Sequence, residues 1–147
     1  MTVEIGGDAP YFESLDTYKG KKNIVLYFYP KDDTPGCTRE AKDFQEAVND
    51  FADLSTVIIG VSKDSEKSHE SFKKKHDLSF ELISDENSEL SKQYGIWVEK
   101  NMFGKSYMGI DRSTFLIDKH GKIRKIWRNV KVSGHVDNVL EIIREIM

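Results

Sequence analysis

Four short stretches of the chain predict β-strands, and three of them are apolar at nearly every position. The first two, residues 24–29 (IVLYFY) and 56–61 (TVIIGV), are rich in β-branched and aromatic side chains. An apolar run without polar alternation is typical of a strand that is covered on both faces of its sheet. Two shorter runs occupy residues 114–117 and 123–127, and the sequence DKHGK between them predicts a β-hairpin.

The segment after the first strand has the spacing of an amphipathic helix. From Cys37 onward, small or apolar side chains recur at intervals that place them on one buried stripe: Ala41, Phe44, Val48 and Phe51. Residues 64–77 predict a polar surface helix with Asp64 as its N-cap. Residues 87–95 predict a short helix that ends at Gly95.

The last segment, residues 134–147, predicts a helix with one apolar face, formed by Val136, Val139, Leu140 and Ile143. The order strand, helix, strand, helix, hairpin and helix predicts an α/β protein with a central mixed β-sheet flanked by α-helices. This is the order of a thioredoxin-like fold. With 147 residues and no repeat or linker, the chain is expected to form a single domain over residues 1–147.

Composition narrows the function classes. The 22 basic and 25 acidic residues nearly cancel, which argues against nucleic acid as a partner. One cysteine excludes an internal disulfide and a multi-cysteine metal site, and it fits a reducing compartment. The start of the chain lacks the pattern of a signal peptide, and no apolar run approaches the roughly 20 residues of a membrane span. We therefore expect a soluble cytoplasmic protein that binds no membrane.

Cys37 is expected at the start of a helix. Pro30 ends the first strand, and Thr34, Pro35 and Gly36 turn the chain into the helix. Unpaired backbone N–H groups and the positive end of the helix dipole would stabilise a thiolate there, and Gly36 leaves room for a small substrate to reach these donors. The alternative is that the cysteine is a small apolar filler of the core.

The stretch YFYPKDDTPGCTREA resembles a known family. The pattern P-x-x-x-T-x-x-C, formed by Pro30, Thr34 and Cys37, is similar to the active-site signature of the peroxiredoxins. The surrounding residues resemble the peroxiredoxin Q branch, also called bacterioferritin comigratory protein. The resemblance continues through residues 68–85, 94–118 and 131–140, and so covers nearly the whole chain.

The resemblance implies a thiol-dependent peroxidase that acts on hydrogen peroxide and organic hydroperoxides without a cofactor or metal. Cys37 would be the peroxidatic cysteine, which becomes a sulfenic acid. Thr34 would hydrogen-bond the substrate oxygen, and Pro30 would shield the sulfur. The family's arginine falls on Arg112, and its orienting glutamate falls on Glu40.

The sequence departs from the branch at Lys42. Many members carry a second, resolving cysteine five residues after the first, but here the segment reads CTREAK. Residues five apart on a helix lie about 8 Å apart, beyond the roughly 7 Å that a disulfide spans. Because the chain has no second cysteine, we expect a one-cysteine mechanism in which an external thiol reduces Cys37: thioredoxin, glutaredoxin or glutathione. The branch is often monomeric, so a monomer is expected.

Several alternatives remain open. The loss of the resolving cysteine would also suit a peroxide sensor on the same fold, whereas the absence of C-x-x-C excludes a disulfide reductase. Residues 97–109 are expected to form a loop that covers the core, or else an apolar collar around Cys37 or a partner surface. The run KKKH at 73–76 is interpreted as a solvated face. The four histidines lack zinc-ligand spacing and are interpreted as surface or structural residues.

Overall fold

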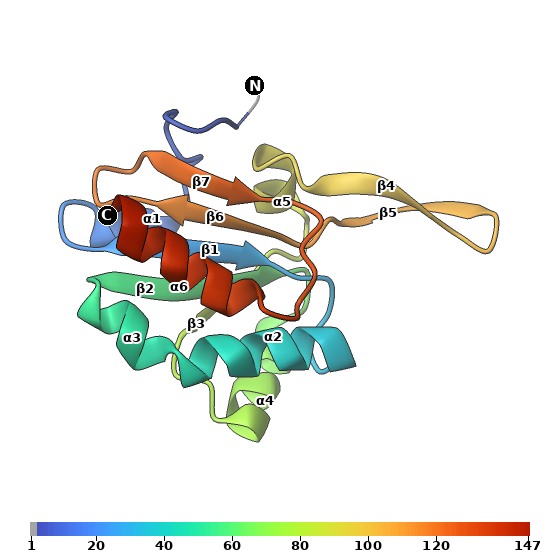
Figure 1. Ribbon diagram of the computed structural model, residues 1–147. Coiled ribbons are helices and arrows are strands. Elements are labelled where there is room, and N and C mark those ends of the chain that lie inside the picture. Colours follow the sequence, from blue (N-terminus) through green and yellow to red (C-terminus); the bar gives the residue numbers. More distant parts are fainter. Residues whose placement is uncertain (1–2) are drawn as a thin grey trace.

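The computed structural model describes residues 3–147, and a five-stranded mixed β-sheet forms its centre (Figure 1). The strand order is β3-β2-β1-β6-β7. Strand β1 pairs in parallel with β2, and β2 with β3, whereas β1–β6 and β6–β7 are antiparallel. The strands are β1 (Asn23–Phe28), β2 (Thr56–Ser62), β3 (Glu81–Ser84), β6 (Ser113–Ile117) and β7 (Ile123–Trp127). The predicted fold class and the four predicted strands are confirmed.

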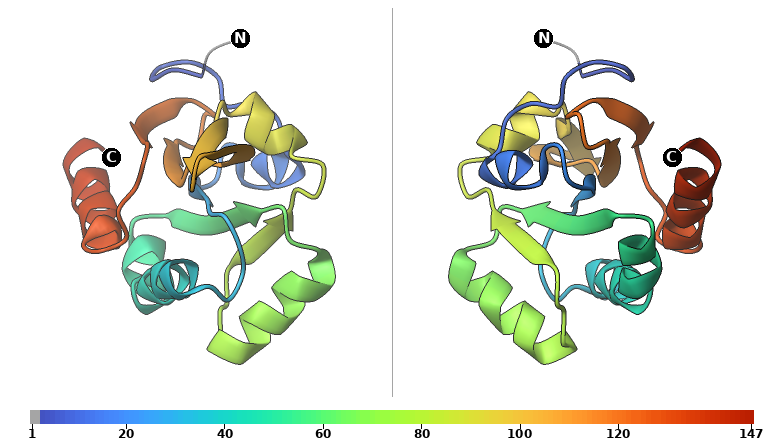
Figure 2. Two further views of the ribbon diagram at one scale, coloured as in Figure 1. Left: turned by 90° about the vertical axis from the view of Figure 1, so that its right-hand side faces the viewer. Right: turned by 90° about the vertical axis from the view of Figure 1, so that its left-hand side faces the viewer.

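Helices cover both faces of the sheet (Figure 2). One face packs against α2 (Pro35–Glu46), α3 (Val48–Asp53), α4 (Glu66–His76) and α6 (His135–Ile146). The other face packs against α1 (Glu13–Tyr18) and α5 (Glu89–Gln93). The central strand β1 supplies alternate side chains to the two cores, which is why its sequence is apolar throughout. Val25, Tyr27 and Tyr29 face the α2 side, and Ile24, Leu26 and Phe28 face the α1 side.

Two details of the predicted helices are wrong. The stripe from Cys37 to Phe51 runs over two helices, because α2 ends and α3 begins around Ala47. The N-cap of α4 is Ser65, whose hydroxyl accepts a hydrogen bond from the Ser68 N–H at 3.1 Å. The predicted cap, Asp64, lies one residue too early, and its carboxylate is used elsewhere.

The other helix predictions hold. Helix α5 is followed by Gly95 with a φ of +73°, a left-handed conformation that favours glycine at a helix end. Helix α6 buries the four predicted apolar residues together with His135. Helix α4 is polar on its outer face, but it buries His69 and Phe72.

The prediction of a loop at residues 97–109 is wrong. Strands β4 (Trp97–Met102) and β5 (Lys105–Ile110) form an antiparallel hairpin that projects from the body of the protein (Figure 1). Its apolar side chains do not cover the core, because most are exposed, with Phe103 at the tip 96% exposed: Met102, Phe103, Tyr107 and Met108. Neither strand of this exposed hairpin is covered by the core, so its sequence mixes apolar and polar residues without a continuous apolar run. The sequence of residues 97–109 therefore could not be distinguished from that of a loop.

Two short elements, α1 and β3, were not expected from the sequence. Each is brief, and Glu81–Ser84 mixes charged, apolar and polar side chains, so neither carries a clear period. Over residues 3–147, none of the helices is long and apolar enough to cross a membrane.

Candidate active site

Cys37 lies in the first turn of α2, at the end of the sheet where β1 leads into the helix. Thr34 is the N-cap residue in an extended conformation, and Pro35 occupies the first helical position, where its fixed φ suits the helix and its missing N–H is not needed. Thr38 is the first residue whose N–H bonds back within the helix, to Thr34 O at 2.8 Å. The N–H groups of Gly36 and Cys37 therefore remain available to a ligand.

The Cys37 side chain is only 2% exposed and contacts an arginine that is 75 residues away in sequence. Arg112 precedes β6, whose first residue pairs with Phe28 of β1, and this pairing brings the arginine to the start of α2. Arg112 Nη2 donates to Cys37 Sγ at 3.3 Å. Arg112 Nη1 donates to Glu40 Oε1 at 2.6 Å. One planar guanidinium thus joins the sulfur to a carboxylate.

Glu40 is fully buried, three residues after Cys37 on the same side of α2. Burial raises its pKa to about 7, although the charge of Arg112 and the hydrogen bond from it act in the opposite direction. Among residues 3–147, its second oxygen, Oε2, has no hydrogen-bond partner, and neither does the hydroxyl of buried Tyr27. Burial, and after it the charges of Glu40 and Cys37, raise the pKa of Tyr27, which keeps this hydroxyl neutral beside the site.

The other predicted site residues lie around this group without bonding to the sulfur. The Thr34 hydroxyl donates to Lys31 O at 2.9 Å, so its oxygen is left as an acceptor. A Cβ added at Gly36 would lie 3.4 Å from Arg112 Nη2, which places Gly36 directly against the guanidinium. Pro30 is exposed on the loop between β1 and α2. The structure therefore brings Cys37, Glu40 and Arg112 into direct contact, with Gly36 beside them.

Lys42 lies five residues after Cys37, at the position of the resolving cysteine in many members of the branch that the sequence resembles. Helix α2 is continuous from Pro35 to Glu46, and the Lys42 side chain is exposed while Cys37 is buried. The two positions therefore face different surroundings, as expected from the helical spacing.

Sequence reasoning missed the residues that support the site. His135, interpreted as surface or structural, is buried and hydrogen-bonded to Thr114 Oγ1 at 2.7 Å. Burial, with the charge of Arg112 adding to it, lowers the pKa of His135 to about 4, so the imidazole is neutral. His69 is buried in a polar cluster with Asp32 and Tyr29. The sequence signal for this cluster is Asp32, two residues after Pro30, and its role cannot be recognised without its distant partner His69.

The raised pKa of Glu40 predicts that the stability of the protein depends on pH. Its pKa of about 7 in the folded protein exceeds its ordinary value of 4.5, so the folded state binds more protons between these values. The free energy of unfolding should therefore fall as pH rises through this window. In Glu40→Gln, the fall between pH 5 and pH 8 should be smaller by about 2 to 3 kcal/mol.

Urea unfolding at both pH values measures this difference. Glu46→Gln is the matched control, since Glu46 is exposed at the end of the same helix. An unchanged pH dependence in Glu40→Gln would contradict the raised pKa.

Comparisons with known proteins identify the family of the chain. Residues 12–126 match the model of the AhpC/TSA family. Peroxiredoxin Bcp of Bacillus subtilis (strain 168) is 51% identical over 154 residues, covering 99% of this chain and 98% of the relative. A mutant of Xylella fastidiosa PrxQ superimposes with a TM-score of 0.90 at 36% identity, covering 99% of this chain and 98% of that chain.

A further structure is that of the bacterioferritin comigratory protein of Xanthomonas campestris, described for its alkyl peroxide reduction activity. It is 44% identical, with a TM-score of 0.82, and the match covers 85% of this chain and 80% of that chain. The fold and the relatives define the class, so the protein is a thiol-dependent peroxidase. The chain belongs to the AhpC/TSA family, within the Bcp or peroxiredoxin Q branch of the peroxiredoxins.

Proposed function

We propose that Cys37 carries out peroxide reduction by a one-cysteine mechanism. The Cys37 thiolate attacks the terminal oxygen of a hydroperoxide, so that an S–O bond forms and the O–O bond breaks. The sulfur loses two electrons and becomes a sulfenic acid. The departing oxygen takes up a proton and leaves as water or an alcohol. The contact between Arg112 and the sulfur carries this proposal, because it places a fixed cation where negative charge moves during attack.

Stabilisation of that moving charge is the main catalytic task. An ordinary thiol with a pKa of about 8.5 is already about 3% ionised at pH 7, so complete ionisation accelerates attack by at most about thirty-fold. One pre-organised donor to a developing oxyanion is typically worth about a hundred-fold or more. Arg112 and the N–H groups of Gly36 and Cys37 are the donors in this site.

The remaining residues have positional roles in the proposal. Glu40 holds one end of the Arg112 guanidinium, so that the other end faces the sulfur. Thr34 presents an acceptor oxygen, since its proton is directed to Lys31 O, and this oxygen would receive the O–H of the peroxide. Pro30 shields the site on the solvent side of the loop.

The sulfenic acid must be reduced by another molecule, because Cys37 is the only cysteine of the chain. An external thiol condenses with it, which forms a mixed disulfide and releases water. A second external thiol then breaks that disulfide and restores Cys37. A thioredoxin-type protein is the reductant that the family relationship favours, with glutaredoxin or glutathione as alternatives. We also propose one domain over residues 1–147, a monomer and a cytoplasmic location, where a free thiol stays reduced.

Mass spectrometry tests the one-cysteine mechanism. After one equivalent of hydrogen peroxide, the protein should gain one oxygen at Cys37, and added glutathione should convert this species into a mixed disulfide. Excess peroxide should drive further oxidation, since no internal thiol competes. An unmodified Cys37 under these conditions would contradict the proposal.

A peroxide sensor is the second candidate function. The observation that favours it is the exposed Lys42 at the position of a resolving cysteine, because oxidised Cys37 then has no internal thiol to reduce it. Steady-state turnover separates the two functions. Hydrogen peroxide and an organic hydroperoxide are each supplied with thioredoxin, glutaredoxin or glutathione regeneration. Continuous turnover with any of these systems supports the peroxidase, whereas a single oxidation without turnover supports the sensor.

A further inference from the structure

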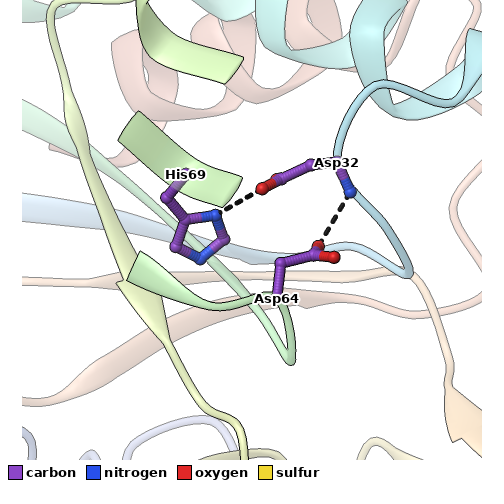
Figure 3. A group of neighbouring side chains, drawn as sticks. All are labelled: Asp32, Asp64 and His69. Carbon is purple, nitrogen blue, oxygen red and sulfur yellow. Dashed lines mark hydrogen bonds and ion pairs between the residues drawn. The ribbon is translucent and has the colours of Figure 1, made fainter. Parts of the chain in front are cut away.

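A buried polar cluster joins the loop between β1 and α2 to helix α4 (Figure 3). Its centre is the Asp32 carboxylate, which is 7% exposed. Oδ1 accepts from the Tyr29 hydroxyl at 2.5 Å. Oδ2 accepts from the Ser68 hydroxyl at 2.8 Å and contacts His69 Nδ1 at 2.7 Å. The cluster therefore links the segment that follows β1 to helix α4.

Both ring nitrogens of His69 face acceptors. Nδ1 faces the Asp32 carboxylate at 2.7 Å, and Nε2 faces the carbonyl oxygen of Ile83 on β3 at 3.0 Å. A neutral imidazole has only one N–H and could satisfy only one of them. With Asp32 ionised, as the hydrogen bonds that it accepts from Tyr29 and Ser68 favour, the two contacts require an imidazolium that donates to both acceptors, although the side chain is only 3% exposed.

The charges around His69 support this protonation state. Burial acts to lower its pKa, but the hydrogen bond to Asp32 and the charges of Asp32 and Asp64 outweigh it and raise the pKa above its ordinary value. For Asp32, burial acts to raise the pKa, yet the hydrogen bonds from His69, Tyr29 and Ser68 lower it overall. Both shifts favour the ion pair that the contacts describe, and in this pair no ring nitrogen of His69 keeps a lone pair for a metal ion.

The cluster also fixes one peptide unit of the loop. The Asp32 N–H donates to Asp64 Oδ2 at 2.8 Å, and that carboxylate is held by the Ser62 hydroxyl at 2.6 Å. The carbonyl oxygen of the same peptide unit, Lys31 O, accepts from the Thr34 hydroxyl at 2.9 Å. Because a peptide unit is planar, turning it would break both bonds together.

The neighbouring residue shows that this loop is held in a strained form. Asp33 has a φ of +60°, a left-handed conformation that costs a non-glycine residue about 1 kcal/mol or more. Its carboxylate is bound by Lys75 Nζ at 2.7 Å and His76 Nε2 at 3.0 Å. Helix α4 therefore holds the loop at two successive aspartates.

We propose that the Asp32–His69 ion pair is a positioning device for peroxide reduction. It fixes the Lys31–Asp32 peptide and, through Lys31 O, the direction in which the Thr34 oxygen presents its acceptor lone pairs to the peroxide. The proposal rests on the role of Thr34 in the proposed function. His69 and Asp32 are positioning residues and not catalytic residues, because neither contacts the sulfur.

The test compares two reactions of Cys37. Peroxide reduction needs the Thr34 oxygen, whereas alkylation by iodoacetamide needs only an accessible thiolate. In His69→Gln, the second-order rate constant with hydrogen peroxide should fall by about ten-fold or more, as small displacements of positioning groups do. The rate constant with iodoacetamide should change by less than about two-fold. His120→Gln, at an exposed turn, is the matched control and should change neither.

A double-mutant cycle with Thr34→Val shows whether His69 acts through Thr34. In the Thr34→Val background, His69→Gln should lower the peroxide rate by less than about two-fold, since the group that it positions is gone. Full additivity of the two effects would overturn the proposal. Equal losses toward peroxide and iodoacetamide would also overturn it, because they would indicate general disruption.

Two further measurements complete the test. Nitrogen NMR of the native protein at pH 7 should show both ring nitrogens of His69 protonated, and an unprotonated nitrogen would overturn the ion pair. Circular dichroism shows whether His69→Gln folds. If it does not, Asp32→Asn, which keeps the shape of the side chain, replaces His69→Gln in the same cycle.

If Thr34→Val alone leaves the peroxide rate unchanged, the proposed role of Thr34 fails together with the positioning. If Thr34→Val slows the reaction and His69→Gln does not, the positioning alone fails.

Discussion

Replacing Cys37 by serine is expected to lower peroxide consumption by at least about 1,000-fold, to the level of the reaction without protein. The serine hydroxyl would keep the shape of the side chain, but it is not ionised near neutral pH and cannot be oxidised as sulfur is. The intact Arg112–Glu40 pair cannot compensate, because it stabilises charge only once a nucleophile attacks. The measurement is peroxide consumption with each regenerating thiol system.

Lys42→Ser is the matched control for this variant. It introduces the same residue on the same helix at an exposed position and should leave turnover unchanged. Substantial peroxide turnover by Cys37→Ser would mean that another group reacts, and it would remove the basis of the proposed mechanism.

Arg112→Met is expected to lower the rate constant of Cys37 oxidation by about 100- to 1,000-fold. The variant removes the donor that lies 3.3 Å from the sulfur. It also leaves Glu40 buried without its cation, but a carboxyl whose pKa is already about 7 can be protonated instead of remaining charged. The fold should therefore survive, and the loss should appear in the chemical step.

Rapid-mixing measurement of oxidation by hydrogen peroxide checks this expectation. Arg39→Met is the matched control, since Arg39 lies two residues after Cys37, its side chain is 65% exposed, and it forms an ion pair with Asp43 on the same helix. Arg112→Lys should recover part of the rate, because lysine keeps the charge but lacks the planar fork that reaches the sulfur and Glu40 together. A peroxide rate in Arg112→Met equal to that of Arg39→Met would exclude Arg112 from catalysis.

The Arg112–Glu40 pair illustrates what tertiary structure adds to a motif. Glu40 reads in the sequence as one of many charged residues on a helix, and Arg112 as a charge beside Asp111. Antiparallel pairing of β1 with β6 brings them together, and both lose most of their contact with water. Burial then raises the pKa of Glu40, which no feature of the local sequence could indicate.

Local patterns predicted the elements that depend on local forces. Runs of mainly apolar residues marked four of the five strands of the central sheet, and glycine marked the end of α5. The sequence Thr34–Gly36 marked the turn into a helix with Cys37 in its first turn, and in the structure that helix begins at Pro35. Patterns failed where the outcome depended on distant contacts, as for the β4–β5 hairpin, whose two strands pair with each other outside the core.

The sequence by itself determined the α/β class, the order of the main strands and helices and the absence of an internal partner thiol, and its family motif indicated Cys37 as the candidate nucleophile, because each depends on residue type and spacing along the chain. Only the tertiary structure decided how the nucleophile is surrounded. Arg112 contacts Cys37 from a separate strand, and His69 reaches the loop before Cys37 from a separate helix. These contacts join residues far apart in the chain, and their strength comes from burial, which exists only after the sheet and its helices have assembled.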